Sequence, residues 1–329
     1  ITDSWPRDAA VQPPTTLLRE DTSRTIIVRK ASPDIPFDRS INPYRGCEHG
    51  CVYCFARPTH AYLGLSPGLD FETQLFFKPD AARLLEAELR RPSYRCNVIA
   101  MGTNPDPYQP VERDKRITRQ ILEVLTAFDH PGGIVTKSTL VLRDLDILAP
   151  MAARGLAQVC VSVTTLDRNL ARRLEPRAAT PARRIETIRT LAAAGVPSGV
   201  MASPMIPGLN DHELEAILSQ ASAAGAEFAS YILIRLPLEI ADLFAEWLKA
   251  HVPNRAKRVM SLIRETRGGK TYQSKFGLRM RGTGTYAELL TQRFQLAVDR
   301  LRLNERGREL DASLFTPPPA NGDQFELFS

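Results

Sequence analysis

The chain has 329 residues, of which 43% are hydrophobic and 24% charged, which is typical of a globular protein with a large core. No run of about eighteen apolar residues occurs, so no membrane span is expected, and the N-terminus does not resemble a secretion signal. The formal net charge of +6 is compatible with an anionic partner such as nucleic acid, but many unrelated proteins share it.

The cysteines indicate the redox compartment. There are five, an odd number, and three of them are clustered. A secreted disulfide framework usually has an even number of cysteines spread along the chain. The pattern therefore predicts a cytoplasmic protein, in whose reducing surroundings clustered thiolates bind metal.

The elements expected along the chain begin with an irregular leader, residues 1–40, which is rich in Pro, Asp, Arg and Thr. From residue 41 to 240, short apolar runs alternate with helical stretches. The predicted strands are Thr25–Arg29 in the leader, then Asn97–Met101, Gly133–Thr136, Gln158–Val163, Val200–Met205 and Ser230–Ile234. The predicted helices are Ala81–Arg91, Thr118–Phe128, Leu145–Ala153, Pro181–Ala194 and Asp211–Ala224, with Asp80, Thr180 and Asn210 or Asp211 as caps.

This repeated strand-then-helix order predicts an α/β fold with a parallel sheet. Five or six such units fit an open or complete (β/α) barrel, in which the active site lies at the C-terminal ends of the strands.

After residue 240 the pattern changes. A C-terminal extension, residues 241–303, contains predicted helices at Ala241–Ala250 and Tyr286–Leu303, separated by a glycine-rich loop over Arg264–Tyr286. Residues 304–329 are polar and rich in proline, and we expect a flexible tail. The basic residues of this loop either contact the phosphates of a nucleic acid or are simply solvated. They are Arg264, Arg267, Lys270, Lys275, Arg279 and Arg281.

The sharpest motif is Cys47, Cys51 and Cys54, spaced four and three residues apart. Three thiolates on one loop can hold a [4Fe-4S] cluster and leave one iron open to the amino and carboxylate groups of a small molecule. The alternative is a zinc site completed by His49 or His60. Zinc prefers four protein ligands, often two CxxC pairs or CxxC with a pair of histidines, and no second pair exists here, so the cluster is favoured.

The spacing Cys-x3-Cys-x-Tyr-Cys, after a first strand, resembles the signature of the radical S-adenosylmethionine (SAM) superfamily. The resemblance extends from about Arg24 to Pro237. It implies a partial (β/α)6 TIM-type barrel that binds a [4Fe-4S] cluster and SAM. It also implies one-electron reduction by a flavodoxin or ferredoxin and cleavage of SAM to a 5′-deoxyadenosyl radical. Tyr53 would shield the cluster near the nucleobase.

Downstream segments resemble the branch that contains spore photoproduct lyase and photolyase-like proteins. The resemblance implies that Asn104 and Asp106 accept from the SAM amino group and that Lys137 pairs with its carboxylate. It also suggests Ser162 and Thr164 as ligands of the ribose. Taken alone, these residues could equally form a proline-rich turn, a solvated charge and an ordinary strand end.

Two further pairs follow the same branch. Glu175 and Arg184 match a Glu-Pro and Arg pair that would orient SAM or merely brace a helix. Met205 and Ile206 end the fifth strand and would pack on the adenine, or they could belong to the core.

The chain also departs from spore photoproduct lyase. That family carries a hydrogen-donating cysteine at the end of the second strand, where this chain reads Met101-Gly102-Thr103. Cys96 and Cys160 lie inside the barrel elements and are expected to be core cysteines. Another donor would be needed, and Tyr62 and Tyr108 are candidates.

Segments around the cysteines, including Asn42-Pro43-Tyr44-Arg45-Gly46-Cys47, resemble a bacterial subgroup that is classed with DNA-repair photolyases. This grouping implies a neighbour and not a substrate. Four residues after the cysteine loop form either an acid–base or substrate-binding set or an anchor for the loop, and they are Arg57, His60, Asp70 and Glu72.

The last residues of the chain suggest a partner. Gln324-Phe325-Glu326-Leu327-Phe328 resembles the short peptide by which bacterial repair proteins bind the DNA sliding clamp, although Phe325 replaces the usual Leu. The alternative is a tail that folds back onto the barrel through its phenylalanines.

These features predict a cytoplasmic radical SAM enzyme that abstracts hydrogen from nucleic acid, with a damaged base as the favoured substrate and carbon–carbon lyase chemistry as one outcome. One alternative is modification of a peptide, RNA or small metabolite. Another is a non-catalytic iron–sulfur protein docked on the sliding clamp.

Overall fold

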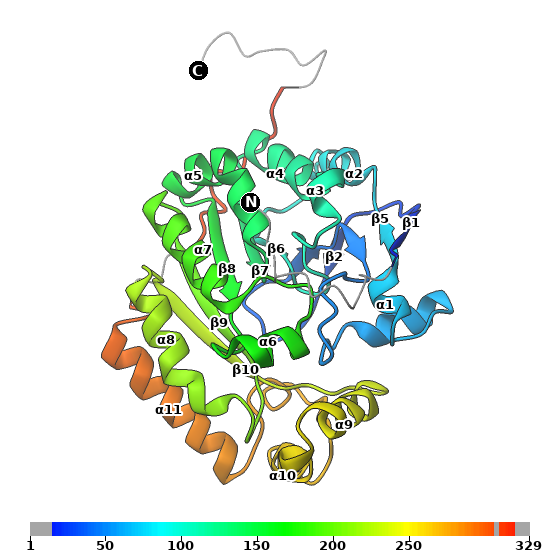
Figure 1. Ribbon diagram of the computed structural model, residues 1–329. Coiled ribbons are helices and arrows are strands. Elements are labelled where there is room, and N and C mark those ends of the chain that lie inside the picture. The colour runs from blue at the N-terminus through cyan, green and yellow to red at the C-terminus, as the bar shows by residue number, and fades with distance from the viewer. Residues whose placement is uncertain (1–14, 306–308, 320–329) are drawn as a thin grey trace.

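A seven-stranded sheet forms the centre of this computed structural model, which describes residues 15–305 and 309–319 (Figure 1). Its strands, in spatial order, are β10 (Phe228–Leu233), β9 (Ser198–Met205), β8 (Ala157–Ser162), β7 (Gly132–Thr136), β6 (Ile99–Met101), β3 (Arg39–Ile41) and β2 (Ile27–Arg29). The neighbours from β10 to β3 are parallel, and β2 joins the edge antiparallel. No pairing joins β10 to β2 in the described chain, so the barrel is partial and open, as predicted.

Helices cover the outer side of this sheet (Figure 1). They are α2 (Ala81–Leu89), α4 (Ile117–Ala127), α5 (Leu145–Ala153), α7 (Pro181–Ala193) and α8 (Leu214–Ala223). In α4 the buried side chains include Ile117, Ile121, Leu122 and Leu125, which recur with the period of a helix and face the sheet. All of these helices and the barrel strands after β3 lie where the sequence predicts them, within a few residues.

Short elements that the sequence did not predict lie between them. They are α3 (Glu112–Lys115), α6 (Arg168–Leu174) and the 3-10 helix at Thr139–Asp144, while the start of the predicted helix Asp211–Ala224 is a 3-10 helix over Asp211–Glu213. Helix α6 begins where the Asp167 carboxylate accepts hydrogen bonds from the Asn169 and Leu170 amides.

The leader is more ordered than predicted. A second sheet combines β1 (Leu17–Glu20), β5 (Gln74–Phe77) and β4 (Tyr44–Arg45), next to α1 (Asp70–Thr73) and a 3-10 helix over Arg57–Leu63. The first barrel strand, β3, already begins at Arg39, inside the predicted leader. The N-terminal segment therefore shares sheets with the barrel.

The C-terminal extension contains α9 (Ile240–His251), α10 (Pro253–Glu265) and α11 (Thr285–Leu301). Helix α11 lies beside α8 (Figure 1), and its Leu290, Phe294 and Val298 belong to the main core. Helices α9 and α10 form a second apolar cluster with Cys51 and Tyr53 beneath the cysteine loop. Helix α10 was not predicted, because its polar residues are numerous, and the extension packs as part of the barrel.

The loop between α10 and α11 closes part of the open edge. The Leu233 amide of β10 donates to the Met280 carbonyl at 2.9 Å, and Arg267 donates to the Ile234 carbonyl at 2.7 Å. On its other side the Gly277 amide donates to Asp34 at 2.6 Å, and Arg279 pairs with the same carboxylate. The loop thus connects β10 with the segment that joins β2 to β3.

The described part of the predicted flexible tail contacts the barrel. The Thr316 amide donates to the Phe128 carbonyl at 3.0 Å, and the Phe315 ring lies 5.4 Å from the rings of Tyr94 and His130. Residues 309–319 are therefore held by an aromatic cluster that their composition did not suggest. The proposed clamp peptide, Gln324–Phe328, lies outside the described residues. No helix in the described chain is both long and apolar enough to span a membrane.

Candidate active site

A cavity of about 150 Å³ opens at the carboxyl ends of the parallel strands. The cysteine loop forms one wall, and the ends of β6 to β10 form the others. This is the position at which barrels of this type place their active sites, because the loops after parallel strands converge there. Cys47, Cys51 and Cys54 all line this cavity, whereas Cys96 and Cys160 do not.

The cysteine loop has a backbone that only glycine tolerates at two positions. Gly46 has φ of +79° and Gly50 has φ of +69°, and a Cβ at Gly46 would lie 2.8 Å from the Phe71 carbonyl oxygen. The Val52 amide donates to the Leu174 carbonyl at 3.0 Å, which ties the loop to α6. The thiols are thus presented by a loop of defined shape.

Two arginines brace this loop. Arg57 donates to the Cys51 carbonyl at 2.9 Å and pairs with Glu72, and Arg177 pairs with Glu72 and donates to the Glu48 carbonyl. Asp70 accepts from the Ser66 amide at 2.9 Å. None of Arg57, Asp70 and Glu72 lines the cavity. Of the two sequence-based interpretations, anchoring of the loop is therefore the one that the contacts support.

The donor set fits a cluster better than zinc. In the described ranges, no three His, Cys, Asp or Glu side chains form a group that could hold a single metal ion. His49 lies 3.5 Å from Asp106, and His60 bonds the Gln74 carbonyl at 2.9 Å outside the cavity, so neither completes a four-ligand site. A cubane needs three thiolates spread around a larger body, with the fourth iron left open.

Burial disfavours the anionic form of the three thiols. Burial, then the nearby Glu175, raises the pKa of Cys51 to about 12, and burial raises the pKa of Cys47 and Cys54. Iron, when bound, would supply the positive charge that stabilises the thiolates.

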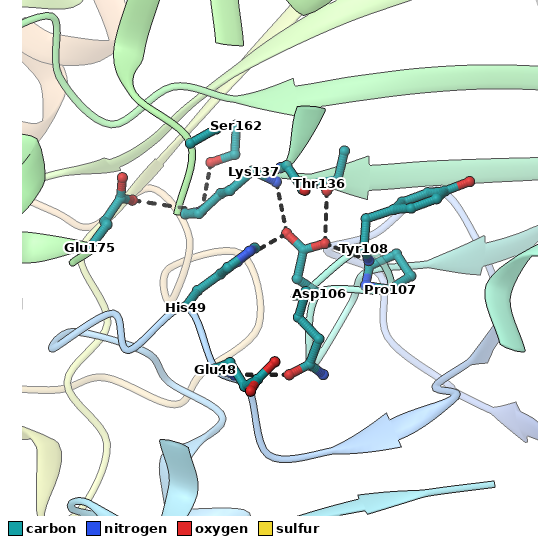
Figure 2. A network of polar contacts seen from close by, with 12 residues as sticks. Glu48, His49, Asp106, Pro107, Tyr108, Thr136, Lys137, Ser162 and Glu175 are labelled. Atoms are coloured by element: carbon teal, nitrogen blue, oxygen red, sulfur yellow. Dashed lines mark hydrogen bonds and ion pairs between the residues drawn. The ribbon is translucent and has the colours of Figure 1, made fainter. Parts of the chain in front are cut away.

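Asp106 organises the wall formed by β6 and β7 (Figure 2). Its carboxylate accepts from the Thr136 hydroxyl and the Lys137 amide, each at 2.7 Å, and from the Tyr108 amide at 2.9 Å. His49 faces it from the cysteine loop, and burial lowers the pKa of that imidazole. Asp106 therefore lines the cavity, as predicted, but most of its hydrogen-bonding capacity is already used.

Lys137 extends along the cavity wall from the end of β7 (Figure 2). Its ammonium donates to the Ser162 hydroxyl at 2.7 Å and lies 4.0 Å from Glu175. Burial opposes the charge of Glu175, but Arg184 and Lys137 outweigh it and lower its pKa to about 2. Glu175 forms its ion pair with the buried Arg184. The positive charge of Lys137 is therefore not fully neutralised and can attract an anion in the cavity.

Behind this wall lies a second set of predicted residues. Tyr53 lines the cavity, and its hydroxyl contacts Glu175 and lies 3.2 Å from the Thr164 hydroxyl. Thr164 donates to Glu175 at 2.6 Å, and Arg184 donates to the Ser162 carbonyl at 3.1 Å. Thr164, Glu175 and Arg184 do not line the cavity, so their contacts position the residues that do.

Asn104 carries an unsatisfied acceptor. Its Oδ1 is buried and has no hydrogen-bond partner, although the residue lines the cavity. A buried carbonyl oxygen without a donor costs free energy, so such an atom points to a missing ligand. The ammonium group of an amino acid is a suitable donor for it, which fits the predicted contact with SAM.

The apolar wall differs from the prediction. Met205 lies in the main core and Ile206 in the cluster beneath the cysteine loop, and neither lines the cavity. Met201, Ser203 and Pro204 of β9 line it instead. Both side chains are fully buried at or just after the end of β9, and their packing on the adenine stays a prediction.

The three predicted catalytic side chains all lie outside the cavity. Tyr108 is buried and donates to Asp144 at 3.0 Å, and Tyr62 is 89% exposed on the 3-10 helix. His60 packs with its ring centroid 5.0 Å from that of Phe71. A catalytic role of these three residues therefore stays a prediction that their positions do not support.

Three of the six basic residues of the loop make structural contacts, while Arg264, Lys270 and Lys275 are exposed. Arg267 is buried among backbone carbonyls, Arg279 pairs with Asp34, and Arg281 lies 4.3 Å above the Tyr231 ring. Sequence analysis instead missed Arg235 and Phe55, which both line the cavity. Arg235 follows β10 by two residues, and its place at a strand end was the available signal.

Comparison with known proteins agrees with this site. The radical SAM superfamily model matches residues 41–221. A Mycobacterium tuberculosis protein of uncharacterised function is 40% identical over 232 residues, covering 70% of this chain and 68% of the relative. A Methanocaldococcus jannaschii protein, also uncharacterised, is 30% identical over 173 residues, which are 53% of this chain and 62% of that protein. The chain therefore belongs to the radical SAM superfamily, whose members use a [4Fe-4S] cluster and SAM.

The fold is similar to that of spore photoproduct lyase. A structure of that enzyme complexed with dinucleoside spore photoproduct superposes with a TM-score of 0.63 at 16% identity, covering 86% of this chain and 79% of that chain. A variant of it with bound AdoMet and the same photoproduct gives a TM-score of 0.64 at 14% identity, covering 86% and 78%. At these identities the likeness establishes the shared architecture.

Proposed function

We propose that this protein cleaves SAM reductively and uses the product to abstract hydrogen from nucleic acid, with a damaged base as the favoured substrate. When bound, the [4Fe-4S] cluster and SAM would supply a 5′-deoxyadenosyl radical in the cavity. A flavodoxin or ferredoxin is the expected electron donor, and the cytoplasm the expected compartment.

The observation that carries this proposal is the content of one cavity. Cys47, Cys51 and Cys54 line it without a fourth protein thiolate, and so do the unsatisfied Asn104 oxygen and the Lys137 ammonium. The thiols would hold the cluster. Lys137 would neutralise the carboxylate of SAM, and Asn104 would accept from its ammonium group.

Two observations favour nucleic acid as the substrate. Spore photoproduct lyase, which shares the fold, binds a dinucleoside photoproduct, and this chain carries a formal net charge of +6.

The hydrogen donor must differ from that of the lyase family. At the end of β6, where that family has its hydrogen-donating cysteine, this chain has Met101, which is fully buried. Among the described tyrosines, Tyr53 alone lines the cavity, so a different donor set or net hydrogen abstraction is part of the proposal.

Each alternative function predicts a different experimental result. A radical SAM enzyme that modifies a peptide, RNA or metabolite would bind DNA weakly and with little dependence on salt, because phosphate contacts impose a steep dependence. A non-catalytic iron–sulfur protein would bind the cluster but would not turn over SAM.

The test is release of 5′-deoxyadenosine by the anaerobically reconstituted, reduced protein. We expect release to rise with ultraviolet-irradiated DNA and not with intact DNA. Cys51→Ala should abolish release and the iron–sulfur absorbance. Cys96→Ala should preserve both, because Cys96 lies outside the cavity.

Each alternative result has a defined meaning. Release that ignores DNA would retain the enzyme class, reject a DNA substrate and favour a peptide, RNA or metabolite. No release from a protein with a complete cluster would favour the non-catalytic alternative. A Cys51→Ala protein that keeps both cluster and turnover would contradict the assignment of the ligands.

A further inference from the structure

Arg235 is a cation in the cavity wall that the binding of SAM does not require. Among the described residues that line the cavity, Lys137 is the one lysine and Arg235 is the one arginine. SAM has one carboxylate, for which Lys137 is placed, and its ammonium and sulfonium groups are positive. A second cation in the same cavity is therefore suited to an anion that belongs to the substrate.

Among the residues that the structure describes, no carboxylate forms an ion pair with the Arg235 guanidinium. Its Nε is buried without a hydrogen-bond partner, and its Nη1 contacts the Met280 sulfur at 3.8 Å, which is a weak acceptor. The nearby carboxylate of Asp34 is already engaged by Arg279 and by the Gly277 amide. Burying unpaired donors of a charged group is costly, so this arrangement favours a ligand that supplies oxygen acceptors.

Phe55 determines which part of the guanidinium remains available. The Arg235 guanidinium carbon lies 4.4 Å from the centroid of the Phe55 ring, and this ring is 40% exposed beside Cys54. Stacking occupies one face of the planar group and leaves its in-plane N–H donors free. In-plane donors match the paired oxygens of a phosphate or a carboxylate.

The surroundings distinguish between these two anions. Pro204, Ile232 and Leu233 line the cavity near the end of β10 and offer apolar surface beside the cation. Lys30, which donates to the Thr103 hydroxyl at 3.1 Å, adds positive charge beside the segment after β6 that carries Asn104. Apolar and aromatic surface next to clustered positive charge suits a base joined to a charged backbone.

We propose that Arg235, supported by Phe55, binds a phosphodiester of the nucleic-acid substrate and so positions the reacting base in the cavity. This assignment rests on the proposed function and specifies how its substrate is recognised. It makes Arg235 a residue that determines the class of substrate.

The test compares two probes with the SAM-loaded, anaerobic holoenzyme by calorimetry. One probe is a thymidine trinucleotide, and the other is its methylphosphonate analogue, in which every linkage is uncharged. We expect the wild-type protein to bind the charged probe more tightly by about tenfold or more, as for a charge-assisted hydrogen-bond pair. Arg235→Gln should remove this preference, and Arg235→Lys should keep part of it, because the charge remains without the planar fork.

Arg281→Gln is the matched control, because Arg281 also stacks on aromatic rings but does not line the cavity. This variant should keep the preference. Iron–sulfur absorbance and SAM affinity report that each variant retains the cofactor site.

The outcomes separate this inference from the proposed function. An Arg235→Gln protein that retains the wild-type preference would overturn the role of Arg235 while leaving a nucleic-acid substrate in place. Equal wild-type affinity for the two probes would mean that Arg235 serves another anion and would also overturn the inference. Failure of the wild-type protein to bind either probe would overturn the inference, while 5′-deoxyadenosine release with ultraviolet-irradiated DNA tests the proposed function separately.

Discussion

Lys137 illustrates how single residues determine the chemistry of the cavity. Its ammonium is held by Ser162 at 2.7 Å, while the Glu175 charge that lies 4.0 Å away is shared with the buried Arg184. The lysine is thus oriented without being fully neutralised. This is the state that a carboxylate-binding cation needs, because a tightly paired lysine would have to break its ion pair first.

Replacing Lys137 with methionine should weaken SAM affinity by about tenfold or more, since one charge-assisted contact is lost. The measurement is calorimetric titration of the reconstituted protein with SAM, with the iron–sulfur absorbance as a check on the cluster. Lys275→Met, on an exposed loop position, serves as the control. Unchanged affinity in the Lys137 variant would contradict the proposed role.

His130 illustrates a residue that affects stability far from the chemistry. It is fully buried, bonded to the Tyr94 hydroxyl at 2.7 Å, and packed against Phe315. Burial lowers its pKa from 6.5 to about 4, against the opposing effect of the Pro131 carbonyl. The unfolded chain therefore takes up this proton at a higher pH than the folded chain does.

The sign of the pH effect follows from that difference. The stabilising contribution is complete above about pH 6.5 and is lost progressively as the pH falls toward 4. Between about pH 7.5 and pH 5, this group should lower the free energy of unfolding by about 2 kcal/mol. His130→Gln should lose less stability than wild type over this interval in urea denaturation. An identical loss in both proteins would show that His130 is not the titrating group.

At the scale of elements, α11 shows that the C-terminal extension stabilises the barrel. Leu290 is fully buried in the main core, while Leu296 on the same helix is 70% exposed. We expect Leu290→Ala to lower the free energy of unfolding by about 2–5 kcal/mol, because it leaves a cavity. Leu296→Ala should change it by less than about 0.5 kcal/mol. Denaturant titration measures both, and equal effects would mean that α11 does not pack as described.

Helix starts show which local signals were reliable. Asp80 and Thr180 do precede α2 and α7, yet neither side chain makes a capping hydrogen bond. Asn210 precedes the 3-10 helix before α8, but its amide donates to the Thr164 carbonyl at 2.6 Å and so joins the ends of two strands. Polar residues at helix starts marked the boundaries correctly, while their partners depended on contacts distant in sequence.

At the scale of the whole molecule, the open edge of the barrel is shaped by segments distant in sequence. The loop after α10 bonds β10 at Met280 and the N-terminal segment at Asp34, and Arg235 lies beside it. Arg267 and Arg279, two of the basic residues that the sequence suggested for phosphate binding, are used in such structural contacts. The charge that remains in the cavity comes from Lys137 and Arg235.

The clamp-docking hypothesis belongs to this scale as well. Deleting Asp323–Ser329 should abolish capture of the sliding clamp, because it removes the Gln324–Phe328 peptide. The thermal stability should stay unchanged, since the anchoring contacts of Phe315 remain. A pull-down with purified clamp measures the effect. Equal capture by the full and shortened chains would reject the hypothesis.

The sequence by itself determined the architecture and predicted the cluster ligands. Cys47, Cys51 and Cys54 are recognisable as candidates because the ligands of one cluster lie on one short loop, so their spacing is a local property. The barrel strands are recognisable because strands of a parallel sheet are buried on both faces and read as continuous apolar runs. Local spacing and local hydrophobicity can be read without knowing the tertiary structure.

Only the tertiary structure decided which side chains meet in the cavity. Asn104, Lys137 and Arg235 follow different strands, and they converge because the sheet curves and brings its carboxyl ends together. Tyr108 and Met205 have equally suitable positions in sequence but are buried in the core, since side-chain direction depends on packing against distant elements. The identity of the cluster was therefore a local question, and the identity of the substrate-facing residues was a global one.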